Sequence, residues 1–278
     1  YKRQELIMAA VRAEKPVNCA VVSPSFSGYE RAIRAYGAGI RYYELDAKNG
    51  FGYDNVCSQL LTSDIQICFI CNPNNPTGNI VPKAIFMDIL DVCKRRNIRL
   101  VVDECFLRFH PAYEDISCKR YLFEYDNLVV INAFTKFYAM AGIRLGYMMC
   151  HDRGFLDKAK EQLPEWNISS IAQRAGIEAL KDNSYEEKTR RLISEERRYI
   201  ISELKNAGCK VYPSEADYIT FRLPEKSRRC NLMEELLKRK ILIRSCDSYR
   251  NMPSGCYRIA VKKHEDNECL IKNIMEVQ

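Results

Sequence analysis

The sequence predicts an α/β protein in which helices cover a mainly parallel sheet, and in which a smaller α/β domain follows a large one. Three observations support this fold class. Short apolar runs alternate with helical patterns through the first two-thirds of the chain, which is typical of parallel sheets. A long, charged helical stretch follows this alternating region. Four more short strand-like runs then come near the C-terminus.

The first part of the chain supplies the predicted large domain. Its apolar, β-branched runs are strand-sized, and the stretches between them carry apolar residues at helical spacing. Pro82 in the first turn and basic residues in the last turn fit the preferences of helix ends. We expect strands at 18–23, 40–45, 65–71, 98–103 and 128–132, and helices at 27–36 and 82–96.

The helical pattern over 169–207 is expected to form one or two long helices, with Gly208 as the C-terminal cap. The sequence beyond it predicts a compact lobe, with helices over 231–240 and 264–277. Its expected strands are 210–212, 218–221, 241–244 and 257–261. We therefore predict a large domain over residues 1–184 and a small domain over 185–278.

Composition excludes several classes of protein. The chain has 278 residues, 47% apolar and 28% charged, the ordinary balance of a globular domain. Its apolar runs fall far short of the roughly 20 residues of a membrane helix, so we expect no membrane partner. Lys and Arg (43) exceed Asp and Glu (36) by 7, but the charges are interspersed, and we expect no nucleic-acid partner.

Cysteine usage indicates a reducing compartment. The 13 cysteines are an odd number, and several lie in apolar runs where a thiol acts as a small hydrophobe. Cys68 and Cys71 form one CxxC pair, but no second pair follows at zinc spacing, so we expect no metal site. We therefore expect a cytoplasmic protein.

Unusual residues follow three of the predicted strands. The segment CNPNNPTGN at 71–79 predicts a rigid loop with outward-pointing amide side chains. Asp103 ends an apolar strand, where an acid is commonly a cap or a surface charge. Lys136 lies in an apolar and aromatic segment just past a strand, where desolvation would make its amine a usable nucleophile. Ligands gather at the carboxyl ends of parallel strands, so we expect these three to converge.

Together these segments meet the requirements of pyridoxal 5′-phosphate. A lysine can form an imine with the cofactor aldehyde, and a carboxylate can keep the pyridine nitrogen protonated. An amide can hydrogen-bond the ring hydroxyl, and Arg144, eight residues past the lysine, can meet the phosphate. The absence of a GxGxxG segment after any strand argues against a dinucleotide site.

The segments NPNNPTG, VVDE and TKFYAMAGIRLGY, in this order and spacing, resemble the fold-type-I pyridoxal-phosphate enzymes of the class I/II aminotransferase family. Within this family the chain resembles the branch of histidinol-phosphate aminotransferases and threonine-phosphate decarboxylases. The resemblance implies a three-layer α/β/α transferase fold, a homodimer and a set of cofactor-binding and substrate-binding residues.

In that resemblance Lys136 is the catalytic Schiff-base lysine, Asp103 is the partner of the ring nitrogen, and Asn75 is the donor to the ring hydroxyl. The remaining roles are also carried over from the family. Phe26 stacks on the ring, Thr135 and Arg144 hold the cofactor phosphate, Arg258 clamps the substrate carboxylate, Arg244 contacts the substrate phosphate, and Asn167 lines the pocket.

The chain departs from the family pattern at several positions. Ala133 stands where relatives carry a Ser or Thr phosphate ligand, and Phe106 stands where histidinol-phosphate aminotransferases carry a tyrosine. Tyr1-Lys2-Arg3-Gln4 replaces a small-residue turn that cradles the phosphate. The N-terminal arm by which relatives reach the partner subunit is also absent, so we expect a longer natural chain.

These observations predict an enzyme that acts on a small, phosphorylated amino acid or amine. Phe106 favours the decarboxylase branch, whereas the broader family favours transamination, and the two reactions stay open. An alternative class is a cofactor-binding or regulatory protein that keeps the fold without turnover, as Ala133 and the missing arm suggest.

Overall fold

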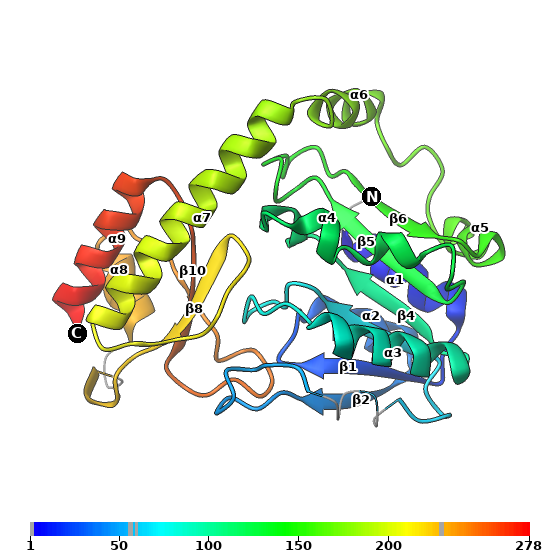
Figure 1. Cartoon of the computed structure of the whole chain (residues 1–278), viewed down its shortest axis with the longest axis horizontal. Coiled ribbons are helices and arrows are strands. Elements are labelled where there is room, and N and C mark those ends of the chain that lie inside the picture. The colour runs from blue at the N-terminus through cyan, green and yellow to red at the C-terminus, as the bar shows by residue number, and fades with distance from the viewer. Residues whose placement is uncertain (1–2, 55–57, 59–60, 228–230) are drawn as a thin grey trace.

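Two sheets organise the chain (Figure 1). The computed structural model describes residues 3–54, 58, 61–227 and 231–278. The six-stranded sheet has the order β2-β1-β3-β4-β5-β6, in which the first five strands are parallel and β6 runs antiparallel to β5. These strands are β1 (Asn18–Ser23), β2 (Gly39–Glu44), β3 (Ile67–Cys71), β4 (Arg99–Asp103), β5 (Leu128–Ala133) and β6 (Gly146–Cys150). The predicted mainly parallel sheet is confirmed.

Helices cover both faces of this sheet. Along β1, Cys19 and Val21 pack in one apolar cluster and Ala20 and Val22 in another, because successive strand side chains point to opposite faces. The first cluster includes residues of α1 (Arg3–Glu14), α2 (Gly28–Tyr36) and α5 (Arg153–Glu161). The second includes α3 (Lys83–Arg95). Burial on both faces explains why the central strands are apolar throughout.

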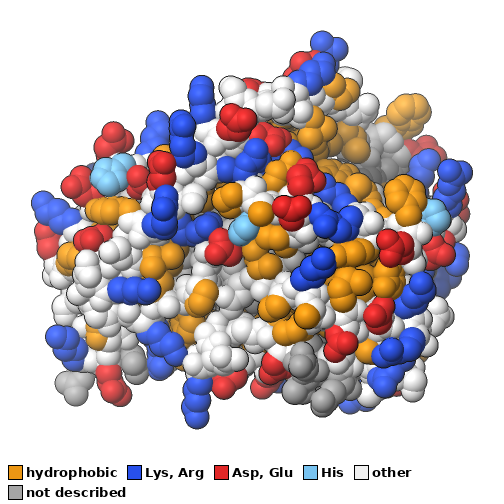
Figure 2. Space-filling model, in the orientation of Figure 1, with side chains coloured by type: hydrophobic (Ala, Val, Ile, Leu, Met, Phe, Trp, Pro, Cys, Tyr) orange, Lys and Arg blue, Asp and Glu red, His pale blue; other side chains and the backbone are white. Residues whose placement is uncertain are grey.

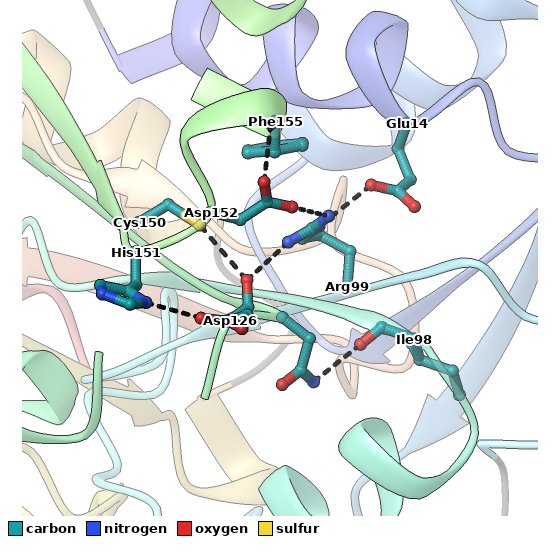
Figure 3. Close-up of polar contacts among 9 residues, drawn as sticks. Glu14, Ile98, Arg99, Asp126, Cys150, His151, Asp152 and Phe155 are labelled. Atoms are coloured by element: carbon teal, nitrogen blue, oxygen red, sulfur yellow. Dashed lines mark hydrogen bonds and ion pairs between the residues drawn. The ribbon is translucent and has the colours of Figure 1, made fainter. Parts of the chain in front are cut away.

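Arg99 ties the first and last of these covering helices to the beginning of β4 (Figure 3). Its Nε lies 3.0 Å from the Glu14 carboxylate at the end of α1, and its Nη2 lies 2.9 Å from Asp152. Asp152 also caps α5 by accepting a hydrogen bond from the Phe155 N–H at 3.0 Å. The predicted elements include none of α1, α5 and β6.

Short helices follow β4, namely η2 (Leu107–Phe109), α4 (Tyr113–Ile116) and η3 (Cys118–Tyr121). The predicted long helical stretch is α6 (Ser170–Ala179) and α7 (Asn183–Asn206), each capped by a side-chain oxygen, from Ser169 and Asp182 respectively. Gly208 follows with φ +76°. In Figure 1, α7 runs from the large sheet to the small one.

The four-stranded sheet has the order β7-β8-β10-β9, and every pairing is antiparallel. Its strands are β7 (Lys210–Val211), β8 (Tyr218–Arg222), β9 (Arg244–Ser245) and β10 (Cys256–Ala260). They pack against α7, α8 (Leu232–Lys238) and α9 (His264–Val277). The short helix η4 (Glu225–Ser227) follows β8. The strand expected at 241–244 begins only at Arg244. The reason is that the Ile241 N–H donates a hydrogen bond to the Leu236 carbonyl at the end of α8, so Ile241 belongs to the turn after that helix. The division at residue 184 stays a prediction.

The surface carries charges of both signs. Figure 2 shows basic and acidic side chains interspersed over this face rather than gathered in one basic area. Among the described residues, no helix combines the length and the apolar character needed to cross a membrane.

Candidate active site

The three predicted segments meet at the carboxyl edge of the parallel sheet. Register pairs Cys71 at the end of β3 with Asp103 at the end of β4, and Asp103 with Ile131 in β5. The loops that carry Asn75 and Lys136 therefore leave the sheet beside Asp103. The predicted convergence is confirmed for these parts of the chain.

The Asn- and Pro-rich loop is buried and hydrogen-bonded, and its amides do not point outward. The asparagines at 72, 74, 75 and 79 are all buried. Asn72 accepts a hydrogen bond from the Val81 N–H at 3.0 Å, and Asn74 donates one to the Pro24 carbonyl at 2.9 Å. The expected outward amides are wrong for these two, because buried backbone groups of the loop need partners.

The small sheet packs directly on this loop. Tyr218 of β8 donates a hydrogen bond to the Asn74 carbonyl at 2.7 Å, and Thr220 donates one to the Pro76 carbonyl at 2.5 Å. Gly78, at φ +84°, allows the close approach, because a Cβ there would lie 2.2 Å from Oγ of Ser214. These contacts hold residues of the small sheet over the carboxyl edge of the large one.

Asp103 is buried and held on both oxygens. Oδ1 accepts a hydrogen bond from the Cys105 N–H at 3.1 Å, and Oδ2 accepts one from the Tyr29 hydroxyl at 2.7 Å. Nε of Arg3 lies 3.2 Å from the same Oδ2. The Arg3 guanidinium carbon also lies 3.9 Å from the centroid of the Phe26 ring. Arg3 thus fills the space between an aromatic face and a carboxylate.

Lys136 borders two cavities. The smaller, of about 190 Å³, is also lined by Phe26, Thr135 and Arg3. Lys136 is an exposed residue, yet desolvation of its amine by the surrounding protein lowers its pKa. The acidic Asp217 opposes this shift, and the positive charge of Arg3 adds to it. The lowered pKa increases the neutral fraction of the amine, the form that can act as a nucleophile.

The larger cavity, of about 850 Å³, brings the predicted substrate residues to the same lysine. Arg258 and Arg244 line it together with Lys136, Phe106 and Asp217. Arg258 and Arg244 are direct register partners on β10 and β9.

Asn75 links the Asn- and Pro-rich loop to this cavity. Its Oδ1 accepts a hydrogen bond from Nη1 of Arg258 and another from the Tyr249 hydroxyl at 3.2 Å. Because the oxygen is used in this way, the amide nitrogen Nδ2 remains as the donor that the predicted role requires.

Two predicted residues lie apart from this group. Arg144 is exposed on the loop before β6, with φ +63°, and Asn167 is exposed just before α6. Neither lines the two cavities that Lys136 borders. Their predicted roles therefore remain predictions.

Three residues of the site were missed by the sequence reasoning. Tyr29 lies only three residues past Phe26, and its position within the predicted helix 27–36 was a usable signal. Arg3 was read as part of an altered turn, with no contact expected for it. Asp217 precedes a strand of the other lobe, and sequence carries no signal that folding brings it near Lys136.

Pyridoxal phosphate fits the residues at this edge. The flat guanidinium of Arg3 makes the two contacts that a protonated pyridine ring requires. It stacks on the face of the Phe26 ring, and it directs an N–H at the Asp103 carboxylate. Its Nη1 is buried without a hydrogen-bond partner, so the same space admits another flat cation once this side chain moves. When bound, pyridoxal phosphate supplies an aldehyde that captures amines and a ring that withdraws electrons.

Comparisons with known proteins agree with this chemistry. The family model for aminotransferase class I and II matches residues 3–274. Threonine-phosphate decarboxylase of Salmonella typhimurium is 32% identical over 274 residues, which are 98% of this chain and 74% of that protein. Histidinol-phosphate aminotransferase of Oleidesulfovibrio alaskensis is 34% identical over 264 residues, which are 94% of this chain and 67% of that protein.

A solved structure of a similar enzyme has the same fold. The crystal structure of histidinol-phosphate aminotransferase from Clostridium acetobutylicum superimposes with a TM-score of 0.91 at 28% identity, covering 99% of this chain and 81% of that one. With its site geometry, the chain therefore belongs to the aminotransferase class I and II family and is an enzyme whose cofactor is pyridoxal phosphate.

Proposed function

We propose that the enzyme acts on a small amino acid or amine that carries a phosphate group. The pairing of Arg244 with Arg258 across β9 and β10 carries this proposal. Like charges directly opposite each other on a sheet are destabilising unless an anion lies between or beside them. Both arginines face the cavity that Lys136 borders, so a substrate with two anionic groups would relieve this repulsion.

Each of the two arginines suits a different anionic group. Arg258 is half-buried and already hydrogen-bonded to Asn75 and Tyr249, so its fork is fixed in orientation and fits a planar carboxylate. Arg244 is exposed at the cavity edge and can follow a bulkier phosphate. Relatives named threonine-phosphate decarboxylase and histidinol-phosphate aminotransferase support a phosphorylated substrate.

The other predicted residues take roles around the cofactor. Lys136 would hold it covalently and then move protons at the substrate, and Asp103 would bind its ring nitrogen. Phe26 would stack on its ring and Asn75 would donate to its hydroxyl. Thr135 and Arg144 would bind its phosphate, with Arg144 moving inward from its exposed position, and Asn167 would line the substrate side.

Two reactions are consistent with this site. The bond of the substrate that stands perpendicular to the ring is the one that breaks, so the orientation set by Arg244 and Arg258 decides between them. A proton in that position gives transamination with Lys136 as the base, and a carboxylate there gives decarboxylation. Phe106 favours decarboxylation on the family pattern.

Product analysis separates the reactions. The enzyme loaded with pyridoxal phosphate is given O-phospho-L-threonine, or histidinol phosphate with 2-oxoglutarate. Carbon dioxide from the first identifies a decarboxylase, and glutamate from the second identifies an aminotransferase. The enzyme could instead retain its cofactor and form neither product, and also fail to turn over unphosphorylated amino acids. That result would contradict the proposal and favour the regulatory alternative.

Arg244→Gln is the matched variant for the phosphate. Because it keeps a polar, hydrogen-bonding side chain while removing the charge, it should lower kcat/KM for phosphorylated substrates several-fold, since solvent screens a charge at the exposed edge of the cavity. Equal losses on unphosphorylated analogues would contradict a phosphate contact.

We also propose that the enzyme is a cytoplasmic homodimer. Apolar side chains are exposed on α6 and the loop before it, where Trp166 is 96% exposed and Ile171 is 72% exposed, as expected of a surface that a second subunit covers. The described cysteines are free thiols, which suits a reducing compartment. Sedimentation analysis that gives a monomer at micromolar concentration would contradict the dimer.

A further inference from the structure

Asp217 is an acidic residue in the lining of a mainly basic cavity. It lies immediately before β8 and lines the large cavity together with Lys136 and Arg258. Its Oδ1 is buried and has no hydrogen-bond partner among the described residues. A buried carboxylate oxygen without a donor is costly, and such groups are rare in folded proteins. The missing donor therefore needs an explanation.

The charges around Asp217 narrow the explanation. The cavity lining holds five cationic side chains and two acidic ones, namely Lys136, Lys240, Arg244, Arg258 and Lys262 against Asp217 and Asp266. Asp266 lies 3.9 Å from Lys262 in an ion pair. Within the described part of the lining, Asp217 is thus the one carboxylate without an ion pair. A positively charged ligand group could therefore bind Asp217 without displacing an ion pair, in addition to the charges of Lys136 and Arg258 that already act on it.

We propose that Asp217 binds the positively charged amino group of the incoming substrate. This rests on the proposed function, in which Arg258 and Arg244 take the two anionic groups of the same molecule. An ammonium group brings both the hydrogen-bond donor and the positive charge that Oδ1 lacks. Two cationic contacts and one anionic contact then fix the substrate in one orientation and deliver its amine beside Lys136.

The ionisation of Asp217 suits this role. Burial raises the pKa of its carboxyl group to about 6, and the positive charges of Lys136 and Arg258 oppose the rise. The group is therefore ionised at neutral pH and gains from a further positive neighbour. A carboxyl group that bound an anionic part of the substrate would have to be protonated under the same conditions.

The test compares ligands that differ only in the amino group. Reducing the loaded enzyme with borohydride fixes the cofactor on Lys136, so ligands bind without reacting. Titration calorimetry then gives the affinity of O-phospho-L-threonine and of its deaminated analogue, 3-phosphonooxybutanoate. In Asp217→Asn the preference for the amine should fall about tenfold or more, while the analogue binds as well as before or better.

Controls separate this effect from general damage and from the proposed function. Asp266→Asn removes the paired acid of the same lining and should leave the amine preference unchanged. An equal loss on both ligands, or an unchanged preference, would overturn the role of Asp217. L-Threonine and 3-hydroxybutyrate repeat the comparison without phosphate. If the wild-type enzyme binds phosphorylated ligands no better than these, the proposed substrate class fails, and the second pair still decides on Asp217.

Discussion

The hydroxyl of Tyr29 donates a 2.7 Å hydrogen bond to Oδ2 of Asp103. Tyr29 is fully buried and stacks on Phe69 at 5.2 Å between ring centroids, so packing places its hydroxyl beside the carboxylate. Burial raises the pKa of Tyr29 well above its usual range, and the charge of Asp103 acts in the same direction. The phenol therefore remains a donor at every working pH, and it holds the carboxylate in place.

Tyr29→Phe tests this support. A hydrogen bond to a buried charged group contributes about 1.5–3 kcal/mol, so the variant should unfold at lower temperature and bind pyridoxal phosphate several-fold more weakly. Equilibrium dialysis measures the second effect. Tyr36→Phe, on an exposed part of the same helix, is the control. Unchanged cofactor affinity in Tyr29→Phe would show that Asp103 needs no help from this hydroxyl.

Arg3→Ser separates two roles of the Arg3 side chain. Its guanidinium lies on Phe26 and beside Asp103, where the pyridine ring would bind, so removal should increase the affinity for pyridoxal phosphate several-fold. The same change leaves a buried carboxylate without its ion pair and should cost the cofactor-free protein about 3–5 kcal/mol of unfolding free energy. Fluorescence titration and thermal unfolding measure the two effects.

Arg12→Ser, on an exposed position of α1, should change neither quantity. Weaker cofactor binding in Arg3→Ser would instead mean that Arg3 contacts the bound cofactor, most simply through its phosphate.

The parallel strands of the large sheet could be predicted because helical patterns separate their apolar runs, which are buried on both faces in β3, β4 and β5. The antiparallel strand β6 was not predicted. The convergence of Asn75, Asp103 and Lys136 followed from parallel topology alone. By contrast, α1 is buried on most of its sides, so it lacks the polar stripe by which a surface helix is recognised.

Contacts between distant segments could not be predicted. Asp217 reaches Lys136 only because β8 packs on the Asn74 carbonyl, and the pairing of Arg244 with Arg258 depends on a strand of two residues. Local patterns carry no information on such packing. The resemblance to a family supplied both arginines, and it could not supply Asp217 or Arg3.

Asp217 also makes stability depend on pH. Its pKa is about 6 in the folded protein against 3.8 in a free side chain, so between these pH values the folded protein binds more protons than the unfolded chain. The unfolding free energy therefore falls as pH rises from about 4 to 6. Asp217→Asn should be more stable than the wild-type enzyme at pH 7 by about 1–3 kcal/mol, and equally stable near pH 4.

Denaturant unfolding of both proteins at the two pH values measures this difference. A variant that is less stable at pH 7 would show that Asp217 has a stabilising partner in the folded protein.

Arg99 should matter for stability and not for catalysis. Its partners Glu14 and Asp152 join α1 and α5 to β4, and its side chain is 14% exposed. Arg99→Met keeps the apolar stem but leaves both acids unpaired, so we expect a loss of about 2–4 kcal/mol. Thermal unfolding measures it, with Arg174→Ala in an exposed pair as the control. Lost turnover at full stability would contradict this separation.

The residue to which pyridoxal phosphate attaches tests the active-site assignment most directly. The protein is mixed with one equivalent of cofactor, reduced with borohydride and digested, and the labelled peptide is identified by mass spectrometry. We expect a single label on Lys136, which is abolished in Lys136→Ala. A label spread over surface lysines, or one that persists in Lys136→Ala, would contradict the assignment of the active site.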